Sequence, residues 1–221
     1  MRVIVTGAAG ILGSAVVSAL VARGDSVASI DRAASLETAV GVHHFTCGDL
    51  SDSTAAASAI DEASSTLGGV DALVHLVGAF AWVPVDQSSI ETWRELYSAN
   101  VETTFNVIKG CLGRLSDRGS IVCVGAASAQ PAAAGMAPYA AAKSGVARLV
   151  EALSAELKPR GIRVNAVLPS IIDTPRNSAD MPNADPKAWT SPRAIAEVIL
   201  FLTRDESRAI NGASIPVTNN A

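Results

Sequence analysis

The first part of the sequence combines an apolar run, three spaced glycines and a second apolar stretch, an order that few folds accommodate. Val3 to Val5 form the first run, and residues 14–22 have the composition of a helix. Strand, glycine turn and helix in this order let the backbone approach a pyrophosphate while the free N–H groups of the helix start face the anion. The predicted dinucleotide contacts are Thr6, Gly7, Ala9, Gly10, Ile11, Leu12 and Gly13.

Length and composition predict one α/β domain over residues 1–221. Of the 221 residues, 49% are hydrophobic and 17% are charged, which suits a large core. The net charge of −4 comes without blocks of like charge, so nucleic-acid binding is not predicted. Three widely spaced cysteines favour buried thiols in a reducing, cytoplasmic compartment. The sequence has no charged leader and no apolar run of membrane-spanning length, so no membrane partner is expected.

Short β-branched runs alternate with longer alanine-rich stretches along the rest of the chain, which is typical of βαβ units. After the first strand, further strands are predicted at 26–30, 42–47, 71–77, 120–124, 162–168 and 213–217. Helices are predicted from 14 to about 23, from 53 to 67, from 89 to 115, from 139 to 158 and from 192 to 202. Residues 170–190 are predicted to be irregular, and a loop of that length is more often a substrate lid than a passive connection.

Acidic residues follow the second and third strands. Asp31 ends the second strand, where a carboxylate accepts hydrogen bonds from the adenosine ribose and repels a 2′-phosphate, so NAD is favoured. Arg32 keeps NADP open, because a guanidinium can pair with that phosphate. Asp49, followed by Leu50, has two interpretations: a contact to adenine, or part of an ordinary helix start.

Tyr139 and Lys143 carry the predicted chemistry. Their i, i+4 spacing places a phenol and an ammonium on one helix face. We expect the positive charge to lower the pKa of the tyrosine toward the working pH, so that the phenol exchanges a proton while a hydride moves. Such pairs are common on helix surfaces. This pair, however, has the glycine turn and Asp31 upstream of it in the expected order, which strengthens the prediction.

Together these residues resemble the short-chain dehydrogenase/reductase family over essentially the whole chain. The matching positions are the glycine turn, Asp31, Asp49-Leu50, Asn100-Val101, Tyr139 with Lys143, and residues 163–169 leading to Thr174. The resemblance implies a single-domain Rossmann fold: a doubly wound parallel sheet of about seven strands with helices on both faces. It also implies hydride transfer at the carboxyl ends of the strands and a homodimer or homotetramer formed through the long helices.

The same resemblance implies individual roles. Tyr139 would be the general acid or base, Lys143 would bind the nicotinamide ribose, and Asn100 would hold a proton-relay water. Thr174 would contact the nicotinamide carboxamide. Gly78 and Pro169 complete the implied cofactor contacts.

Three features depart from the commonest subfamily. The glycines are spaced G-x-x-G-x-x-G instead of G-x-x-x-G-x-G. The usual Asn-Asn-Ala-Gly and Pro-Gly become residues 75–78, His-Leu-Val-Gly, and residues 169–170, Pro-Ser. Ala126 occupies the position of the catalytic serine, 13 residues before Tyr139, and an alanine cannot donate a hydrogen bond to a substrate oxygen.

Ala126 leaves two hypotheses open. Residues 125–143 and 168–190 resemble the dihydropteridine reductase branch, which carries alanine at this position and reduces quinonoid dihydropterins with NADH. The chain differs from that branch in keeping Asn100 and in having Phe80 where the branch typically has tryptophan. Alternatively, Ser128 supplies the missing hydroxyl: residues 126 and 128 of an extended segment face the same side about 6.6 Å apart, and a bulge would bring Ser128 into place.

We therefore predict an NAD-dependent oxidoreductase acting on a small carbonyl, hydroxyl or conjugated C=N substrate. A non-catalytic NAD-binding sensor is the alternative, and the intact Tyr139–Lys143 pair favours the enzyme. The histidines at 43, 44 and 75 lack metal-ligand spacing, so we predict strand or core histidines and no metal. Trp82 and Trp189 lie in loops expected to line the pocket, where they either contact substrate or pack.

Overall fold

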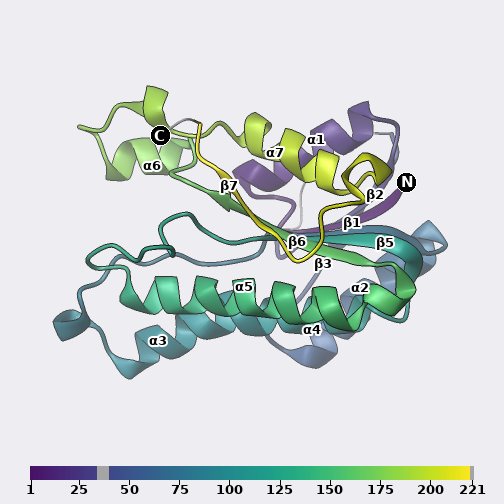
Figure 1. The fold of residues 1–221 in the computed structure, drawn as a ribbon, viewed down its shortest axis with the longest axis horizontal. Helices are drawn as coiled ribbons and strands as arrows, with labels where there is room; N and C mark the ends of the chain where they lie inside the picture. Colours follow the sequence, from purple (N-terminus) through teal and green to yellow (C-terminus); the bar gives the residue numbers. More distant parts are fainter. Residues whose placement is uncertain (34–39, 220–221) are drawn as a thin grey trace.

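A parallel sheet between two layers of helices forms the protein in a computed structural model that describes residues 1–33 and 40–219 (Figure 1). Its seven strands have the order β3-β2-β1-β4-β5-β6-β7, and all neighbours run parallel. The strands are β1 (Arg2–Thr6), β2 (Ser26–Asp31), β3 (Val42–Thr46), β4 (Val70–His75), β5 (Leu115–Val124), β6 (Arg163–Pro169) and β7 (Ser214–Val217). The strand order reverses between β1 and β4, and α/β proteins bind ligands beside such a reversal. The predicted doubly wound Rossmann fold is confirmed.

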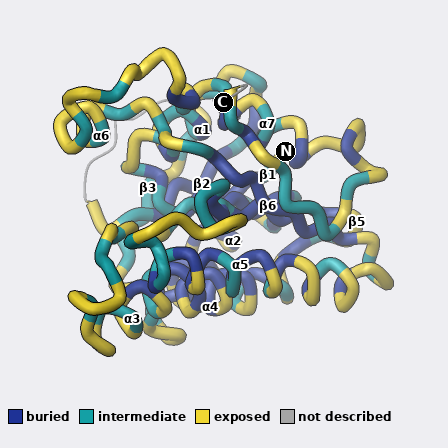
Figure 2. The backbone as a smooth tube through the Cα atoms, turned by 60° about the vertical axis from the view of Figure 1, so that its left-hand side comes forward, coloured by how far each residue is buried: buried dark blue, intermediate teal, exposed yellow. Residues whose placement is uncertain are grey.

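Helices cover both faces of the sheet, as Figure 1 shows. The helices α1 (Ile11–Ala22) and α7 (Pro192–Leu202) pack on one face. The other face carries α2 (Ser53–Leu67), α4 (Thr103–Cys111) and α5 (Ala137–Glu156), with α3 (Ile90–Tyr97) preceding α4. Successive strand residues point to opposite faces, so Val3 and Val5 pack under α1 while Ile4 packs under the other layer. Figure 2 shows the central strands buried between the layers, which explains their nearly continuous apolar runs.

Helix starts follow their expected capping chemistry. The Asp52 carboxylate accepts a hydrogen bond from the N–H of Ala55 at the start of α2. The Ser191 hydroxyl does the same for Ala194 at the start of α7, where Pro192 occupies the first turn. Both predicted helix starts are therefore confirmed.

Several predicted elements differ from the structure. The region 89–115 is not one helix, because a π-helical turn, Ser98–Glu102, separates α3 from α4. The strand β4 ends at His75 instead of residue 77, and β5 starts at Leu115, where it pairs with Val70 across an irregularity in the ladder. Residues 170–190 contain a short helix, α6 (Pro175–Asp180), because Thr174 caps its first turn and Pro175 suits it.

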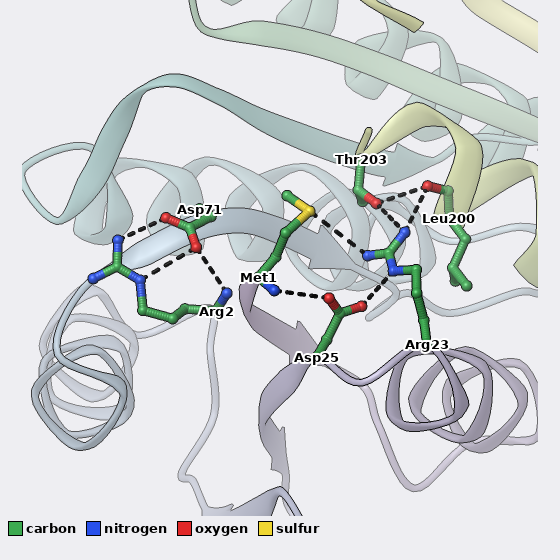
Figure 3. A network of polar contacts seen from close by, with 7 residues as sticks. All are labelled: Met1, Arg2, Arg23, Asp25, Asp71, Leu200 and Thr203. Atoms are coloured by element: carbon green, nitrogen blue, oxygen red, sulfur yellow. Dashed lines mark hydrogen bonds and ion pairs between the residues drawn. The ribbon is translucent and has the colours of Figure 1, made fainter. Parts of the chain in front are cut away.

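Ion pairs and hydrogen bonds of charged residues connect the amino ends of neighbouring strands in the sheet (Figure 3). The Arg2 guanidinium lies 2.6 Å from the Asp71 carboxylate and joins β1 to β4. Its hydrogen bond lowers the pKa of Asp71 to about 2. The amino group of Met1 and the guanidinium of Arg23 both pair with Asp25.

Among the described residues, no helix combines the length and apolar character that a bilayer crossing needs.

Candidate active site

The glycine turn joins β1 to α1 and leaves the start of the helix open. Gly7 has a φ of +73°, and a Cβ on Gly13 would lie 2.2 Å from the Gly7 carbonyl oxygen, so a larger residue at 13 would force α1 away from the turn. No side chain in the described ranges caps the helix at Gly10. The first N–H groups of a helix have no acceptor within it, so those of Ile11, Leu12 and Gly13 suit a pyrophosphate.

Thr6 supports this turn from inside the sheet. Its hydroxyl lies 2.8 Å from Nδ1 of His75, the neighbouring residue on β4, and both side chains are buried. Burial, with the nearby Lys143 charge as a smaller cause, lowers the pKa of His75 to about 3. His75 Nε2 has no hydrogen-bond partner among the described residues. His75 is therefore the core histidine of the predicted pair of alternatives, whereas His43 and His44 are strand histidines on β3, of which His43 is exposed.

The Asp31 carboxylate lies at the end of β2 and fastens the turn. Oδ2 of Asp31 accepts a hydrogen bond from the N–H of Ala9 at 3.0 Å, and Oδ1 accepts one from Ala33 at 3.0 Å. A cavity of about 290 Å³ lies close by, lined in part by Arg32, Asp49, Leu50, Val77 and Gly78. The glycine turn, the carboxylate and this cavity therefore form one continuous candidate surface for a dinucleotide.

Asp49 fits both interpretations that the sequence left open. It lines the cavity, and its Oδ1 accepts a hydrogen bond from the Ser51 N–H at 2.9 Å. That hydrogen bond, together with the Ser51 side chain, lowers the pKa of the Asp49 carboxyl. Leu50 is almost fully buried beneath it.

Asn100 lies in the π-helical turn and is fully buried. Its Nδ2 donates hydrogen bonds to the carbonyl oxygens of Leu96, at 2.8 Å, and Ala79, at 3.0 Å, and its Oδ1 accepts the Ala79 N–H at 3.3 Å. The side chain therefore fastens the loop after β4 to the helical layer. π-Helical turns are rare and are frequent at functional sites, which agrees with the predicted importance of this residue.

Lys143 reaches the same place from α5. Its Nζ donates a hydrogen bond to the Val124 carbonyl oxygen at 3.0 Å and lies 6.0 Å from the centre of the Tyr139 ring. Gly78 passes closely over it: a Cβ on Gly78 would lie 2.6 Å from Asn100 Oδ1 and 3.0 Å from Lys143 Nζ. The structure thus brings Gly78, Asn100, Tyr139 and Lys143 together at the carboxyl ends of β4 and β5.

One electrostatic expectation is wrong in this structure. Burial raises the pKa of Tyr139 to about 12 and lowers that of Lys143 to about 8, so the ammonium does not bring the phenol toward neutral pH. The cause is desolvation, because both side chains are largely removed from water, which disfavours the charged form of each. At neutral pH the phenol is therefore protonated and the amine is mostly charged.

The segment around Ala126 differs from the extended geometry assumed for Ser128. Ala126 is buried, and its carbonyl oxygen accepts the N–H of Ala129 at 3.2 Å, while Gln130 bonds back to Ala127 at 3.1 Å. Residues 127 and 128 therefore form a turn, so the alternation of side chains in an extended segment, which the prediction for Ser128 assumed, does not apply here. Ser128 is half-buried in this turn.

The segment after β6 is anchored at both ends. The Pro169 carbonyl oxygen accepts the N–H of Ala127 at 2.9 Å. The hydroxyl of Thr190, which is fully buried, contacts Ser170 Oγ at 2.8 Å and donates to the Val217 carbonyl oxygen at 3.1 Å. The Thr174 hydroxyl caps α6 by accepting the Asn177 N–H. Of the two tryptophans, Trp189 packs in the interior, whereas Trp82 is 60% exposed.

Sequence reasoning did not anticipate the contact between Phe80 and Tyr139. The two ring centroids lie 4.9 Å apart with the planes at 83°. The residues are far apart in sequence, and no local pattern pairs them. The same holds for Thr6 and His75, whose pairing depends on the register of β1 and β4.

Comparisons with known proteins agree with this geometry. A family model described as enoyl-(acyl carrier protein) reductase matches residues 7–219. Meso-2,3-butanediol dehydrogenase of Serratia marcescens is 31% identical over 99% of this chain and 93% of its own length. D-Threitol dehydrogenase of Mycolicibacterium smegmatis is 28% identical over 97% of this chain and 90% of its own. A short-chain dehydrogenase/reductase structure from Brucella melitensis superposes with a TM-score of 0.90 at 29% identity, covering 98% of this chain and 94% of that one.

Proposed function

Because the chain belongs to the short-chain dehydrogenase/reductase family and is an oxidoreductase that uses a nicotinamide cofactor, we propose that it is an NAD-dependent enzyme with Tyr139 as its acid or base. The observation that carries the proposal is the grouping of Tyr139, Lys143 and Asn100 around Gly78, next to the glycine turn. A protein that only sensed the nucleotide would need the turn but not this buried group. We therefore favour catalysis over the sensor alternative.

The preference for NAD rests on Asp31. The Ala9 N–H donates a hydrogen bond to the Asp31 carboxylate and holds it at the end of β2. In a bound dinucleotide the hydroxyls of the adenosine ribose would lie beside this carboxylate. A negative charge there accepts hydrogen bonds from ribose hydroxyls and repels a 2′-phosphate. Arg32 lines the adjacent cavity and is the residue that would admit NADP instead.

The described residues fit the cofactor at three places. The open start of α1 would take the pyrophosphate, the cavity beside Asp49 and Leu50 would take the adenine, and Lys143 would hold the nicotinamide ribose. Pro169, at the end of β6, and Thr174, at the cap of α6, would border the nicotinamide. When bound, the cofactor supplies or accepts the hydride.

Tyr139 supplies the proton. Its phenol is protonated at neutral pH and so carries the proton that a carbonyl substrate takes up when it gains a hydride, but burial raises its pKa to about 12 and makes it a weaker acid, which a nearby positive charge has to offset. Lys143 is charged below its pKa of about 8, and its Nζ lies 6.0 Å from the centre of the Tyr139 ring. Its positive charge there stabilises the negative charge that the phenol acquires when it gives up its proton. Asn100 holds the loop over both residues through its bonds to Ala79 and is the proposed holder of a relay water.

We propose a small carbonyl, hydroxyl or conjugated C=N substrate. Two relatives are named for oxidation of alcohols, D-threitol and meso-2,3-butanediol, which supports a CH–OH or C=O group. The second candidate, dihydropteridine-like reduction, is favoured by Ala126: a conjugated ring accepts a hydride without a serine to polarise its carbonyl. Ser128 remains the alternative source of a hydroxyl, because it is half-buried in the same loop.

The segment 170–190 is our proposed substrate lid. Its anchors at Ser170 and Thr190 are buried or half-buried, while most residues between them are exposed. A segment fixed at both ends and exposed between them can cover a pocket without disturbing the sheet. In Figure 1 it projects beyond the sheet together with α6.

We further propose a homodimer or homotetramer formed through the long helices of the α4–α5 layer. Large side chains are exposed on α4 and on the neighbouring α3, among them Phe105 at 48% and Tyr97 at 52%. A hollow lined in part by Trp93, Tyr97 and Ala141 lies between α3 and α5.

We place the enzyme in the cytoplasm, which the three free thiols, Cys47, Cys111 and Cys123, support.

A substrate panel tests the proposed function. Purified protein is assayed for NADH and NADPH oxidation with quinonoid dihydropterin, quinones and small ketones, and for NAD reduction with small diols. We expect turnover with NADH in one of these classes and a preference for NADH over NADPH. Tight NADH binding without turnover across the panel would favour the sensor.

A further inference from the structure

Three consecutive residues after β4 each contact the group formed by Tyr139, Lys143 and Asn100. Gly78 passes against Lys143 Nζ and Asn100 Oδ1. Ala79 exchanges two backbone hydrogen bonds with the Asn100 side chain. Phe80 places its ring against the ring of Tyr139, in the steeply inclined arrangement that aromatic pairs prefer. The segment thus contacts the whole group, and Phe80 is its contact to the acid or base.

The backbone of Phe80 is fixed on both sides. On one side are the bonds from Ala79 to Asn100. On the other side, the Trp82 indole N–H donates to the Ala134 carbonyl oxygen at 3.1 Å, and the next residue, Val83, bonds through its N–H to the Gly135 carbonyl oxygen at 2.8 Å. The ring of Phe80 is 55% exposed, so burial alone does not account for its placement. Its position is set by the loop, and the loop aims it at Tyr139.

We propose that Phe80 is a positioning residue, which holds the Tyr139 ring in one orientation and keeps water from one side of its phenol. The inference rests on the proposed role of Tyr139. Removing the Phe80 ring should let the Tyr139 ring move and should expose its phenol to water. A residue that only stabilised the fold would change neither the orientation nor the hydration of Tyr139. A misplaced acid or base slows the chemical step while leaving cofactor binding intact.

The tyrosine content of the chain allows a direct test. Tyr97 and Tyr139 are the two tyrosines, so in a Tyr97→Phe background the tyrosinate absorbance reports Tyr139 alone. Burial raises the pKa of Tyr139 to about 12. We expect Phe80→Leu to lower the titration midpoint by about one pH unit, because water reaches the phenol and stabilises its charged form. Phe201→Leu, at the 43% exposed phenylalanine on α7, is the matched control and should leave the midpoint unchanged.

Kinetics supply the second readout. We expect Phe80→Leu to lower kcat about tenfold with an unchanged KM for NADH, and to shift the pH profile of kcat in the direction of the titration. Phe80→Tyr keeps a ring at this position and should restore kcat. If Phe80→Leu does not fold, as judged by circular dichroism at each pH, Phe80→Met replaces it because it preserves side-chain volume.

Distinct results overturn the inference and the proposed function. If Tyr139→Phe is inactive but Phe80→Leu changes neither the midpoint nor kcat, or if Phe201→Leu has the same effect, Phe80 is not a positioning residue. If Tyr139→Phe keeps full turnover, the role of Tyr139 fails, and the role of Phe80 fails with it.

Discussion

The hydroxyl of Thr6 and Nδ1 of His75 lie 2.8 Å apart, inside the sheet and beneath the glycine turn. The two residues are direct neighbours in the register of β1 and β4. This hydrogen bond therefore connects the strand that leads into the turn with the strand that leads to Gly78. Because burial lowers the pKa of His75 to about 3, the connection is made by a neutral imidazole at neutral pH.

Replacing His75 should change the pH dependence of stability. Its pKa is about 3 in the folded protein against an ordinary 6.5, so between these values the unfolded chain binds a proton that the folded chain does not. The free energy of unfolding of the wild type should then fall with decreasing pH below about 6.5, by up to about 1.4 kcal/mol per pH unit. His75→Asn, whose side chain does not titrate, should flatten this slope.

Urea unfolding at neutral pH and near pH 5 measures the slope. Asp71 does not interfere, because its pKa changes only between 3.8 and about 2, where stability is lost as the pH falls through the lower value. An equal slope in His75→Asn would contradict this account of His75.

Asp31→Asn should weaken the discrimination between the two cofactors. Asparagine still offers an oxygen to the Ala9 N–H, whose hydrogen bond to Asp31 measures 3.0 Å, but the charge that repels a 2′-phosphate is gone. We expect the ratio of kcat/KM for NADH over NADPH to fall by about tenfold or more. Arg32→Ala is the companion variant and should disfavour NADPH. An unchanged ratio in Asp31→Asn would remove the basis for assigning NAD.

Ala126→Ser tests the missing hydroxyl. Ala126 is buried and stands where, by the family resemblance, a serine would donate to the substrate's carbonyl oxygen, so Ala126→Ser would restore that donor. For a ketone substrate we expect kcat/KM to rise by about tenfold, which corresponds to about 1.4 kcal/mol. Ser128→Ala is measured alongside it. If Ser128→Ala lowers turnover strongly and Ala126→Ser changes nothing, Ser128 already supplies the donor.

Thr190→Val should loosen one anchor of the segment 170–190. The Thr190 hydroxyl bonds to Ser170 and Val217, and valine keeps the volume while leaving the Val217 carbonyl oxygen without this donor. We expect a loss of about 1–3 kcal/mol in unfolding free energy and faster proteolysis between 170 and 190. Thr66→Val is the matched control, because the Thr66 hydroxyl is exposed and donates to the Glu62 carbonyl oxygen within its own helix, α2. Equal cleavage rates in both variants would show that the anchor has no such role.

Local signals in the sequence predicted most of the fold. The apolar runs predicted every strand. The predicted helix starts at 53 and 192 agree with the structure, where Asp52 and Ser191 cap them, because capping depends on neighbours a few residues away. The break between α3 and α4 was missed, since a π-helical turn keeps helical periodicity in the sequence. The spacing of Tyr139 and Lys143 paired those two residues, whereas Asn100 was named only through the family resemblance.

Contacts across the sheet and between loops were beyond local signals. The pairs Thr6–His75 and Phe80–Tyr139 join residues more than 50 positions apart, and they follow from strand register and loop placement. The shift in the pKa of Tyr139 was predicted in the wrong direction. The spacing shows that a positive charge is near, but it does not show how far burial removes both side chains from water.

The most direct test of the account is turnover by Tyr139→Phe alongside its affinity for NADH, measured by fluorescence titration. The phenol hydroxyl is the proposed proton donor, whereas the ring that packs against Phe80 is retained in this variant. We predict a loss of about 10³-fold in kcat with an NADH affinity within about twofold of the wild type. Turnover close to the wild-type rate, with the same affinity, would contradict the assignment of Tyr139 as the acid or base.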